Sequence, residues 1–421
     1  MPVDRLLALQ VTPPQFPWLG DSLPVGILFL LHVAVAEFSV GAVTLAVIME
    51  WRALATKDPR PWRYANAAVN SLYFIFSVGA TLAVFAVVLL FGLWGNDVGH
   101  LANVLLPLLA LAFGLFFFIA PLLTVYRNTW QRMSPRNHAI LGTVVAALMT
   151  FFVFLIVGLD AYLITPFHGG LWDATLNAAY WPLLIHRLIG NVSWTALFLA
   201  AYAAIRLRRA ADTGDRSFQA WAAHVNLRIG LTLALLMPIE GLVLSFVLQS
   251  SQPGFFTNLV DGDSAWLMVV QEVFLGIILV CGNIALALEG AARERGNRIA
   301  IAATLASLLG MVLASLPDAV LPGSLEAVRF AGIAVAIAAT ALHLWLRRQP
   351  LLAAPRGVAV PQPHSPRMLR PTLVVVGSFA LLTSLLMGVI KESARGDYAV
   401  YGVLTQAQAQ QRFTPPADLY P

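Results

Sequence analysis

The sequence predicts an all-α, polytopic membrane protein, a bundle of about ten transmembrane helices. Hydrophobic residues make up 59% of the 421 residues, and charged residues make up 11%. That charged fraction is less than half of the share typical of soluble domains. The mean hydropathy is +0.77. Apolar windows long enough to cross a hydrocarbon core of about 30 Å recur along the whole chain.

The expected spans follow these apolar windows. In chain order they lie near residues 24–50, 70–94, 101–126, 138–164, 181–206, 226–249, 265–288, 299–317, 327–346 and 371–390. The first twenty residues lack a basic segment leading into an apolar core and a cleavage site, so no removable signal peptide is predicted. The one cysteine, Cys281, lies inside a span, which excludes an internal disulfide and a Cys-ligated metal cluster.

The connecting segments alternate in charge. Those near residues 51–63, 126–138, 206–216, 289–298 and 346–370 carry most of the Lys and Arg, whereas the segments between them carry none. By the positive-inside rule the basic group is cytoplasmic, so both termini face outward from a bacterial cytoplasmic (inner) membrane. The net charge of +5 is therefore a topology signal and does not indicate a nucleic-acid partner.

We accordingly divide the chain into three parts: an outward N-terminal segment at 1–23, a transmembrane bundle at 24–390 and an outward tail at 391–421. A Pro-rich cytoplasmic linker at 350–370 interrupts the bundle. There is no separate soluble domain to carry a reaction, so the chemistry must lie within the bundle or be supplied by partners.

Ionisable residues inside membrane spans are costly and mark candidate sites. They are His32 and Glu37 on the first span, Asp160 on the fourth, His186 and Arg187 on the fifth, Glu240 on the sixth, Glu272 on the seventh, and Lys391 and Glu392 at the end of the tenth. Most of them fall within about two turns of the predicted outer helix ends. The candidates therefore form one layer near the outer face.

His32 and His186 are the candidate ligands of a haem or metal. An intramembrane imidazole can bind iron, relay protons or hydrogen-bond to a neighbouring helix. Two histidines at similar depth, each followed by small residues, favour a flat macrocycle, although small residues also let helices pack closely. His100, His138, His224 and His343, in outer loops or near inner helix ends, are not expected to bind a ligand.

The seventh span offers the second axial ligand. Met268 and Gln271 lie three residues apart, on one helix face, at a depth like that of His186. Met268 could face His186 across a haem, with Gln271 as the other candidate, although Met is also a common filler of apolar cores. Glu272 is expected to pair with Arg187, or both to contact haem propionates, because an unpaired buried carboxylate is costly.

Four stretches resemble subunit I of the cytochrome bd quinol oxidases. They are "LHVAVAEFSVGAVTLAVIMEW" (31–51), "NHAILGTVVAALMTFFVFLIVGLDAYLITP" (137–166), "WPLLIHRLIGNVSWTALFLAAYAAIRLRR" (181–209) and "KESARGDYAVYGVLT" (391–405). The resemblance implies that His186 and a residue of the seventh span hold a low-spin haem b. It further implies that His32 and Glu392 are ligands of two high-spin haems, with Arg395 in the matching motif.

The departures from the family pattern are equally specific. The third span carries no counterpart of the family's paired glutamates, and the outward loop after the sixth span, which carries the family's quinol-oxidising residues, is short. The Arg of the family's Trp-x-x-Arg-x-Met motif is missing, and an extra hairpin precedes the Glu392 helix. These features indicate a divergent relative, in which Glu37 or Asp160 could serve a proton path.

Three functions remain open. The first is a haem b-containing electron-transfer subunit that connects the quinone pool to an outer partner, such as a c-type cytochrome or a molybdoenzyme. The second is a terminal quinol:oxygen oxidoreductase. The third is a haem-free membrane anchor or transporter. The resemblance implies one to three haems, one of which could be haem d, together with quinone and a second membrane subunit.

Overall fold

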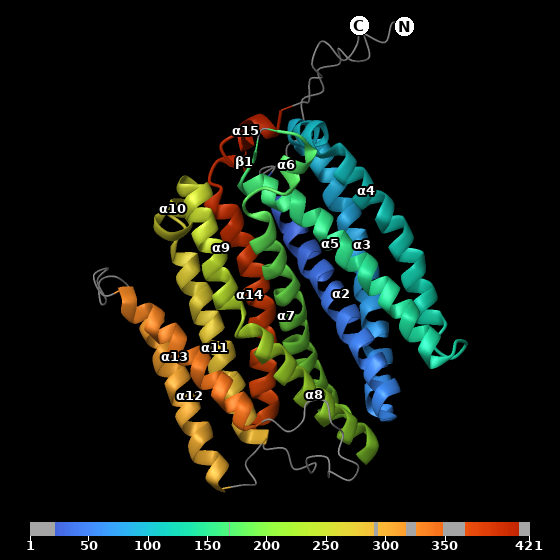
Figure 1. Cartoon of the computed structure of the whole chain (residues 1–421). Coiled ribbons are helices and arrows are strands. Elements are labelled where there is room, and N and C mark those ends of the chain that lie inside the picture. Colours follow the sequence, from blue (N-terminus) through green and yellow to red (C-terminus); the bar gives the residue numbers. More distant parts are fainter. Residues whose placement is uncertain (1–21, 168, 290–293, 317–325, 348–366, 412–421) are drawn as a thin grey trace, which may run out of the picture.

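The computed structural model describes residues 22–167, 169–289, 294–316, 326–347 and 367–411 (Figure 1). The helices are α2 (Ser22–Thr56), α3 (Pro59–Leu93), α4 (Gly95–Asn128), α5 (Pro135–Ile164), α6 (Leu171–Thr175), α7 (Tyr180–Arg209), α8 (Thr213–Ala234), α9 (Met237–Ser251), α10 (Pro253–Asp261), α11 (Trp266–Glu289), α12 (Glu294–Ala314), α13 (Glu326–Leu346), α14 (Leu369–Ala394) and α15 (Gln406–Ala409). The strands are β1 (Tyr398–Val400) and β2 (Leu404–Thr405), which pair antiparallel.

The predicted all-α transmembrane bundle is confirmed. Within the described residues nine helical segments are long and apolar enough to cross a membrane, with α8 and α9 together forming one of them, and α12 adds a shorter apolar helix at Arg298–Ala314. Nine of the ten expected spans therefore correspond to one helix each, and the sixth, 226–249, corresponds to α8 and α9. The predicted N-terminal segment 1–23, the linker 350–370 and the end of the tail lie wholly or mostly outside the described residues.

Several helices are longer than the apolar windows that predicted them. The α3 helix begins at Pro59, after Asp58 has capped its first turn through the Arg60 N–H. The residues between the second and third expected spans, 95–100, are instead the start of α4. Hydropathy locates the part of a helix that lies in hydrocarbon, whereas hydrogen bonding continues the helix into polar flanks. The segments between the long helices also contain α6 and α10, and the β1–β2 hairpin follows α14; none of these elements was predicted.

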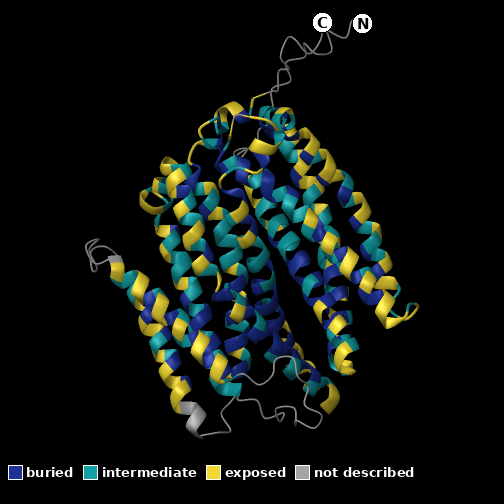
Figure 2. Cartoon of the chain, in the orientation of Figure 1, coloured by how far each residue is buried: buried dark blue, intermediate teal, exposed yellow. Residues whose placement is uncertain are grey.

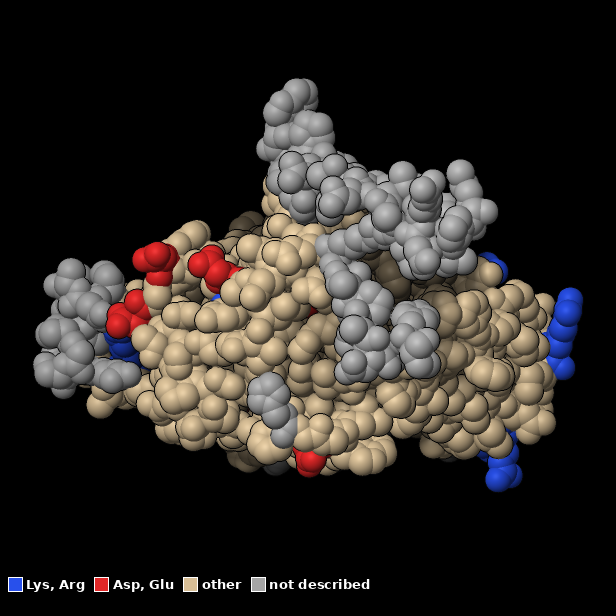
Figure 3. Space-filling view, turned by 90° about the horizontal axis from the view of Figure 1, so that it is seen from above, with Lys and Arg blue, Asp and Glu red and all other residues tan. Residues whose placement is uncertain are grey.

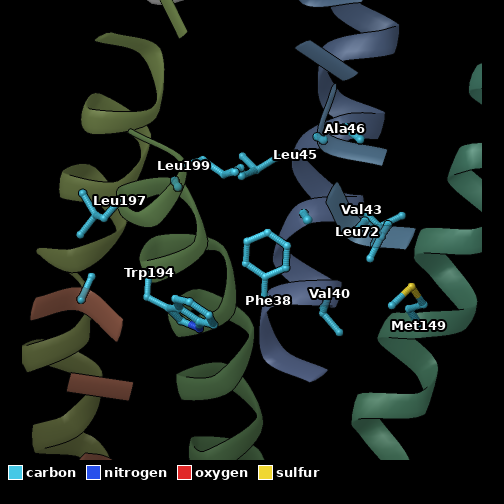
Figure 4. Close-up of a cluster of buried hydrophobic side chains, with 14 of the residues drawn as sticks. Phe38, Val40, Val43, Leu45, Ala46, Leu72, Met149, Trp194, Leu197 and Leu199 are labelled. Atoms are coloured by element: carbon cyan, nitrogen blue, oxygen red, sulfur yellow. The ribbon is translucent and has the colours of Figure 1, made fainter. Parts of the chain in front are cut away.

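The centre of the bundle is formed by α2, α7 and α14, which pack against one another. Buried residues concentrate there (Figure 2). Phe38 of α2 lies against Trp194 of α7, with ring centroids 5.9 Å apart (Figure 4). The two helices approach closely at Gly41, where a Cβ atom would lie 2.3 Å from the Asn191 carbonyl oxygen and 2.3 Å from Thr195 Oγ1. A glycine at this position lets α2 and α7 bring their side chains together.

The α12–α13 hairpin lies at one edge of the bundle, against α11 (Figure 1). A buried polar cluster joins the three helices. The Asn283 amide of α11 donates to Ser307 Oγ of α12 at 3.1 Å and to Thr340 Oγ1 of α13 at 2.8 Å. His343 Nδ1 lies 2.8 Å from Oδ1 of the Asn283 side chain. Because hydrocarbon provides no competing partners, these hydrogen bonds fix the position of the hairpin.

Both ends of the described chain meet at the same end of the bundle. The Gln410 side chain donates to Ser22 Oγ at 3.0 Å, and Ser22 donates to Gln406 at 3.4 Å. This end is shown in Figure 3, where the described surface is mainly uncharged, some acidic side chains are visible, and basic side chains appear only towards the rim. The basic segments after α2, α4 and α7 lie at the opposite end.

Candidate functional site

Four charged side chains from α2, α5, α7 and α14 form one network inside the bundle. Arg187 is paired with Asp160 and lies 3.3 Å from Glu37 Oε1. Lys391 Nζ lies 2.9 Å from the second Asp160 oxygen. Ser384 donates to Glu37 at 2.6 Å. Two carboxylates and two cations neutralise each other in this Arg187 network, which is how charges persist in a region of low dielectric constant.

The Arg187 network corrects one expected pairing. Glu272 was predicted to pair with Arg187, but Arg187 binds Glu37 and Asp160 instead. Glu272, on α11, interacts electrostatically with Arg329 of α13. The helix order explains the difference, because α14 packs between α7 and α11 and supplies Lys391 to the network. Partner choice among buried charges thus depends on helix neighbours that a hydropathy profile does not reveal.

His186 is held by a carboxylate from the neighbouring α9 helix. Its Nδ1 atom is hydrogen-bonded to Glu240 Oε2, while Glu240 Oε1 is buried without a hydrogen-bond partner. Pro238 lies in the first turn of α9, where the chain restarts a helix after α8. This break brings Glu240 alongside His186. The pair leaves the Nε2 atom of His186 as the ring nitrogen that can bind a ligand.

His32 is oriented in a similar way on α2. Its Nδ1 atom lies 3.1 Å from the carbonyl oxygen of Gly79 on α3, so Nδ1 donates and Nε2 is left as an electron-pair donor. Histidine ligands of metals commonly donate their other ring N–H to a carboxylate or a backbone carbonyl. In both His32 and His186 the Nε2 atom is therefore free of these hydrogen bonds, which fits axial ligation of haem iron. Their role as haem ligands stays a prediction.

The other predicted ligands stand in different surroundings. Met268 is half-buried in the first turn of α11. The Gln271 amide donates to the Thr383 carbonyl of α14 at 3.4 Å, and its Oε1 atom is buried without a partner. Since α14 packs between α11 and α7, Gln271 contacts a helix that lies between it and His186. The choice between Met268 and Gln271 as a second axial ligand stays a prediction.

Glu392 and Arg395 form an ion pair at the end of α14. The Glu392 side chain is 50% exposed, whereas Arg395 is buried and also donates to the Ala399 carbonyl. Asp97, a residue that sequence reasoning missed, interacts with both. It is buried in the first turn of α4, and its Oδ1 atom has no hydrogen-bond partner. The third expected span, 101–126, carries no acidic residue, but α4 begins six residues before that window, at Gly95, and so includes Asp97.

A second cluster that sequence reasoning missed lies at the other end of the bundle. Glu50, at the end of the "AVIME" stretch, accepts a hydrogen bond from Tyr126 at 2.5 Å and lies 3.0 Å from His138 Nδ1. His138 Nε2 lies 2.9 Å from the Tyr126 carbonyl oxygen. Both ring nitrogens are thus engaged, so His138 has none left for a ligand. It was expected to be an ordinary interfacial histidine, but it is fully buried.

An apolar cavity of about 220 Å³ lies between α2, α3, α7 and α14. Ala34, Val35, Phe38, Phe74, Ile75, Val78, Trp194, Phe198 and Leu381 line it. Its lining consists of hydrocarbon and aromatic surface, apart from the Trp194 indole N–H, which is buried without a partner. The cavity is therefore suited to the apolar part of a cofactor or quinone.

Comparison with known proteins finds a matching protein family and a solved structure with a similar fold. Residues 23–259, more than half of the chain, match the family described as cytochrome bd terminal oxidase subunit I. The matched range includes His32, Asp160 and His186, and it ends before Met268 and Glu392. No curated protein matches the chain significantly. A solved structure described as bd oxidase from Geobacillus thermodenitrificans is similar in fold, with a TM-score of 0.54 at 16% identity, covering 89% of this chain and 96% of that one.

Proposed function

We propose that this chain, which belongs to the cytochrome bd terminal oxidase subunit I family, is the haem b-binding subunit of a quinol:oxygen oxidoreductase. The observation that carries the proposal is the orientation of His186 by Glu240, which leaves Nε2 for iron. His32 and its Gly79 partner support a second haem nearby. A bound haem supplies one-electron transfer and, where one coordination position stays open, reaction with oxygen.

The protein's own residues would perform three tasks. Glu240 and Gly79 fix the tautomers and orientations of His186 and His32. The Arg187 network supplies buried cations that can contact propionates, and its carboxylates, Glu37 and Asp160, can accept protons. The Glu392–Arg395 pair would stand at the outward end with Asp97, where protons or a partner can reach it.

A second candidate function is electron transfer to a redox partner on the outer face, such as a c-type cytochrome, without oxygen reduction. One observation favours it: within the described α4 helix, Asp97 is the one acidic residue, and it lies in the first turn rather than deep in the bundle. Both candidates place the subunit in a bacterial cytoplasmic membrane with its termini outward, as the loop charges indicate. Both expect quinol and a second membrane subunit as partners.

A reduced-minus-oxidised optical spectrum of the purified protein tests haem binding. We expect a haem b signal that is lost in His186→Ala and altered in Glu240→Gln, with the variants eluting like the parent in size-exclusion chromatography. His224→Ala is the matched control, because His224 Nδ1 pairs with Glu289 at 2.7 Å in a similar His–carboxylate arrangement. A colourless parent protein, or a full signal in His186→Ala, would contradict the proposal.

Oxygen uptake with a quinol donor separates the two candidate functions. Quinol-dependent oxygen consumption by haem-loaded protein with its membrane partner supports the oxidase. If quinol reduces the haem but no oxygen is consumed, the result supports electron transfer to a protein on the outer face. In that case the family membership and the haem assignment stand, and the oxidase activity does not.

A further inference from the structure

A polar hollow opens between α3 and α4 at the end of the bundle opposite Ser22. Its volume is about 480 Å³. Asn66, Asn70, Arg127, Asn128, Trp130, Gln131 and Arg132 line it. The lining thus combines two guanidinium groups, four side-chain amides and one indole, and it contains no carboxylate. Such a lining suits an anion that accepts several hydrogen bonds.

Arg127, one of the two arginines, is held in position by neighbouring side chains of α3. Arg127 Nε donates to Asn70 Oδ1 at 3.1 Å, and its guanidinium carbon lies 4.7 Å from the centre of the Tyr73 ring. Asn70 is itself held by its amide bonds to Asn66. In the described part of the chain, neither the terminal nitrogens of Arg127 nor the side chain of Arg132 forms an ion pair. Both groups therefore remain available to an anionic ligand.

The hollow lies where the apolar part of α3 begins. The α3 helix has 35 residues, which gives a length of about 52 Å, well above the roughly 30 Å of a hydrocarbon core. Its sequence changes from Asn66–Asn70 to an apolar run that starts at Leu72. The asparagines thus stand at headgroup level. Trp130, an amphipathic ring typical of membrane interfaces, stands at the same rim.

Aromatic side chains lie further along the same pair of helices. Phe76 of α3 stacks on Phe116 of α4 with centroids 5.7 Å apart. The neighbouring Phe113 and Phe117 pack edge to face at 5.0 Å and are mostly exposed. This surface is suited to contact with acyl chains. A free inorganic anion would not contact these aromatic side chains. The polar hollow and the aromatic side chains together therefore favour a ligand with a charged head and an apolar tail.

We propose that the α3–α4 hollow binds the phosphate headgroup of an anionic glycerophospholipid, with Arg127 and Arg132 contacting the phosphate oxygens. Basic pockets between transmembrane helices on the cytoplasmic side are suited to such headgroups. The lipid would join the end of α3 to the end of α4, which already contact each other through the Arg127–Asn70 hydrogen bond and the Trp62–Trp130 ring pair. This proposal is independent of the redox function.

Native mass spectrometry of the full-length protein in detergent, titrated with phosphatidylglycerol, tests the proposal. We expect Arg127→Gln/Arg132→Gln to bind phosphatidylglycerol about 30-fold more weakly than the parent, the loss expected for two basic contacts. Arg132→Gln alone should weaken binding about 5-fold. Because Arg132 makes no side-chain ion pair among the described residues, this single variant tests the site without disturbing the fold.

The matched control is Arg208→Gln/Arg209→Gln, which removes two exposed charges from the end of α7 at the same end of the bundle. Retained affinity in this control supports a defined site, whereas an equal loss there would reduce the effect to diffuse surface charge. Displacement of the lipid by equimolar inorganic phosphate would show a free-phosphate site. Equal binding of phosphatidylcholine would show binding by tails alone. Any of these three results overturns the proposal.

Discussion

The Nδ1 atom of His138 lies 3.0 Å from a carboxylate oxygen of Glu50, and neither side chain reaches solvent. With Tyr126 donating to the other Glu50 oxygen, this cluster joins α2, α4 and α5. We expect His138→Ala to lower the free energy of unfolding by about 3 kcal/mol, because it leaves a buried carboxylate without its partner. Unfolding by SDS in mixed micelles measures the change.

Glu50→Gln provides the comparison, since it keeps the side-chain shape and one acceptor for Tyr126. It should cost less than His138→Ala. If both variants unfold like the parent, the cluster contributes nothing to stability.

Arg187 should be needed for the stability of the bundle centre. Arg187→Met leaves Glu37 without a cation and Asp160 with Lys391 alone, so we expect a loss of about 3 kcal/mol or more. The double variant Arg187→Met/Glu37→Gln should recover part of that loss, because it removes the unpaired charge as well. Thermal denaturation in detergent compares the two, with Arg208→Met as an exposed control. Additive losses in the double variant would argue against coupling between Arg187 and Glu37.

Gly41 should tolerate no larger side chain. A methyl group there would overlap the Asn191 carbonyl and the Thr195 hydroxyl, so Gly41→Ala must move α7 away from α2. We expect a cost of about 1–3 kcal/mol. Gly26→Ala, on the same helix with nothing within 4 Å of the added carbon, is the control. Equal melting temperatures for Gly41→Ala and Gly26→Ala would contradict this close packing.

Asp58, in the turn between α2 and α3, gives a prediction that depends on pH. Burial acts to raise the pKa of this carboxyl, but its hydrogen bonds and ion pair with Arg60 outweigh burial and hold the pKa below its usual value. A depressed folded-state pKa means that the carboxylate stabilises the protein above its unfolded pKa of about 3.9, and that this stabilisation is lost as the pH falls through the folded value.

Asp58→Ala should therefore cost about 1 kcal/mol, through loss of the helix cap, at every pH between 8 and roughly 5. The difference from the parent should shrink below about pH 4. Asp263→Ala, which removes an exposed carboxylate, is the control and should show no such difference. A difference that grows on acidification would show that the sign of the Asp58 shift is wrong.

Hydropathy and loop charge were sufficient to predict the fold class. A segment that crosses a membrane as a single helix satisfies its own backbone hydrogen bonds, and it is visible in the sequence as a long apolar window. The ten expected spans all became helices for this reason. Helix ends were predicted less well. Polar residues such as Asp58 and Asp97 extend or cap helices outside the hydrocarbon, where hydropathy carries no information.

Side-chain partners could be predicted only where they follow from chain proximity. The Glu392–Arg395 pair is three residues apart on one helix turn. The Arg187–Asp160 and His138–Glu50 pairs join distant segments, and only the packing order of the helices decides them. His138 was not expected to be part of a site because a histidine near an inner helix end is ordinary in a membrane protein. Glu50 and Tyr126, which exclude that solvent, come from two other helices.

The hydrogen-bonded junction between Asn283 and the α12–α13 hairpin has a consequence for assembly. The hairpin occupies the flank of α11 and presents exposed leucines and isoleucines from α12 in its place. Any neighbouring protein on that side of the bundle would therefore contact α12 and α13 before α11.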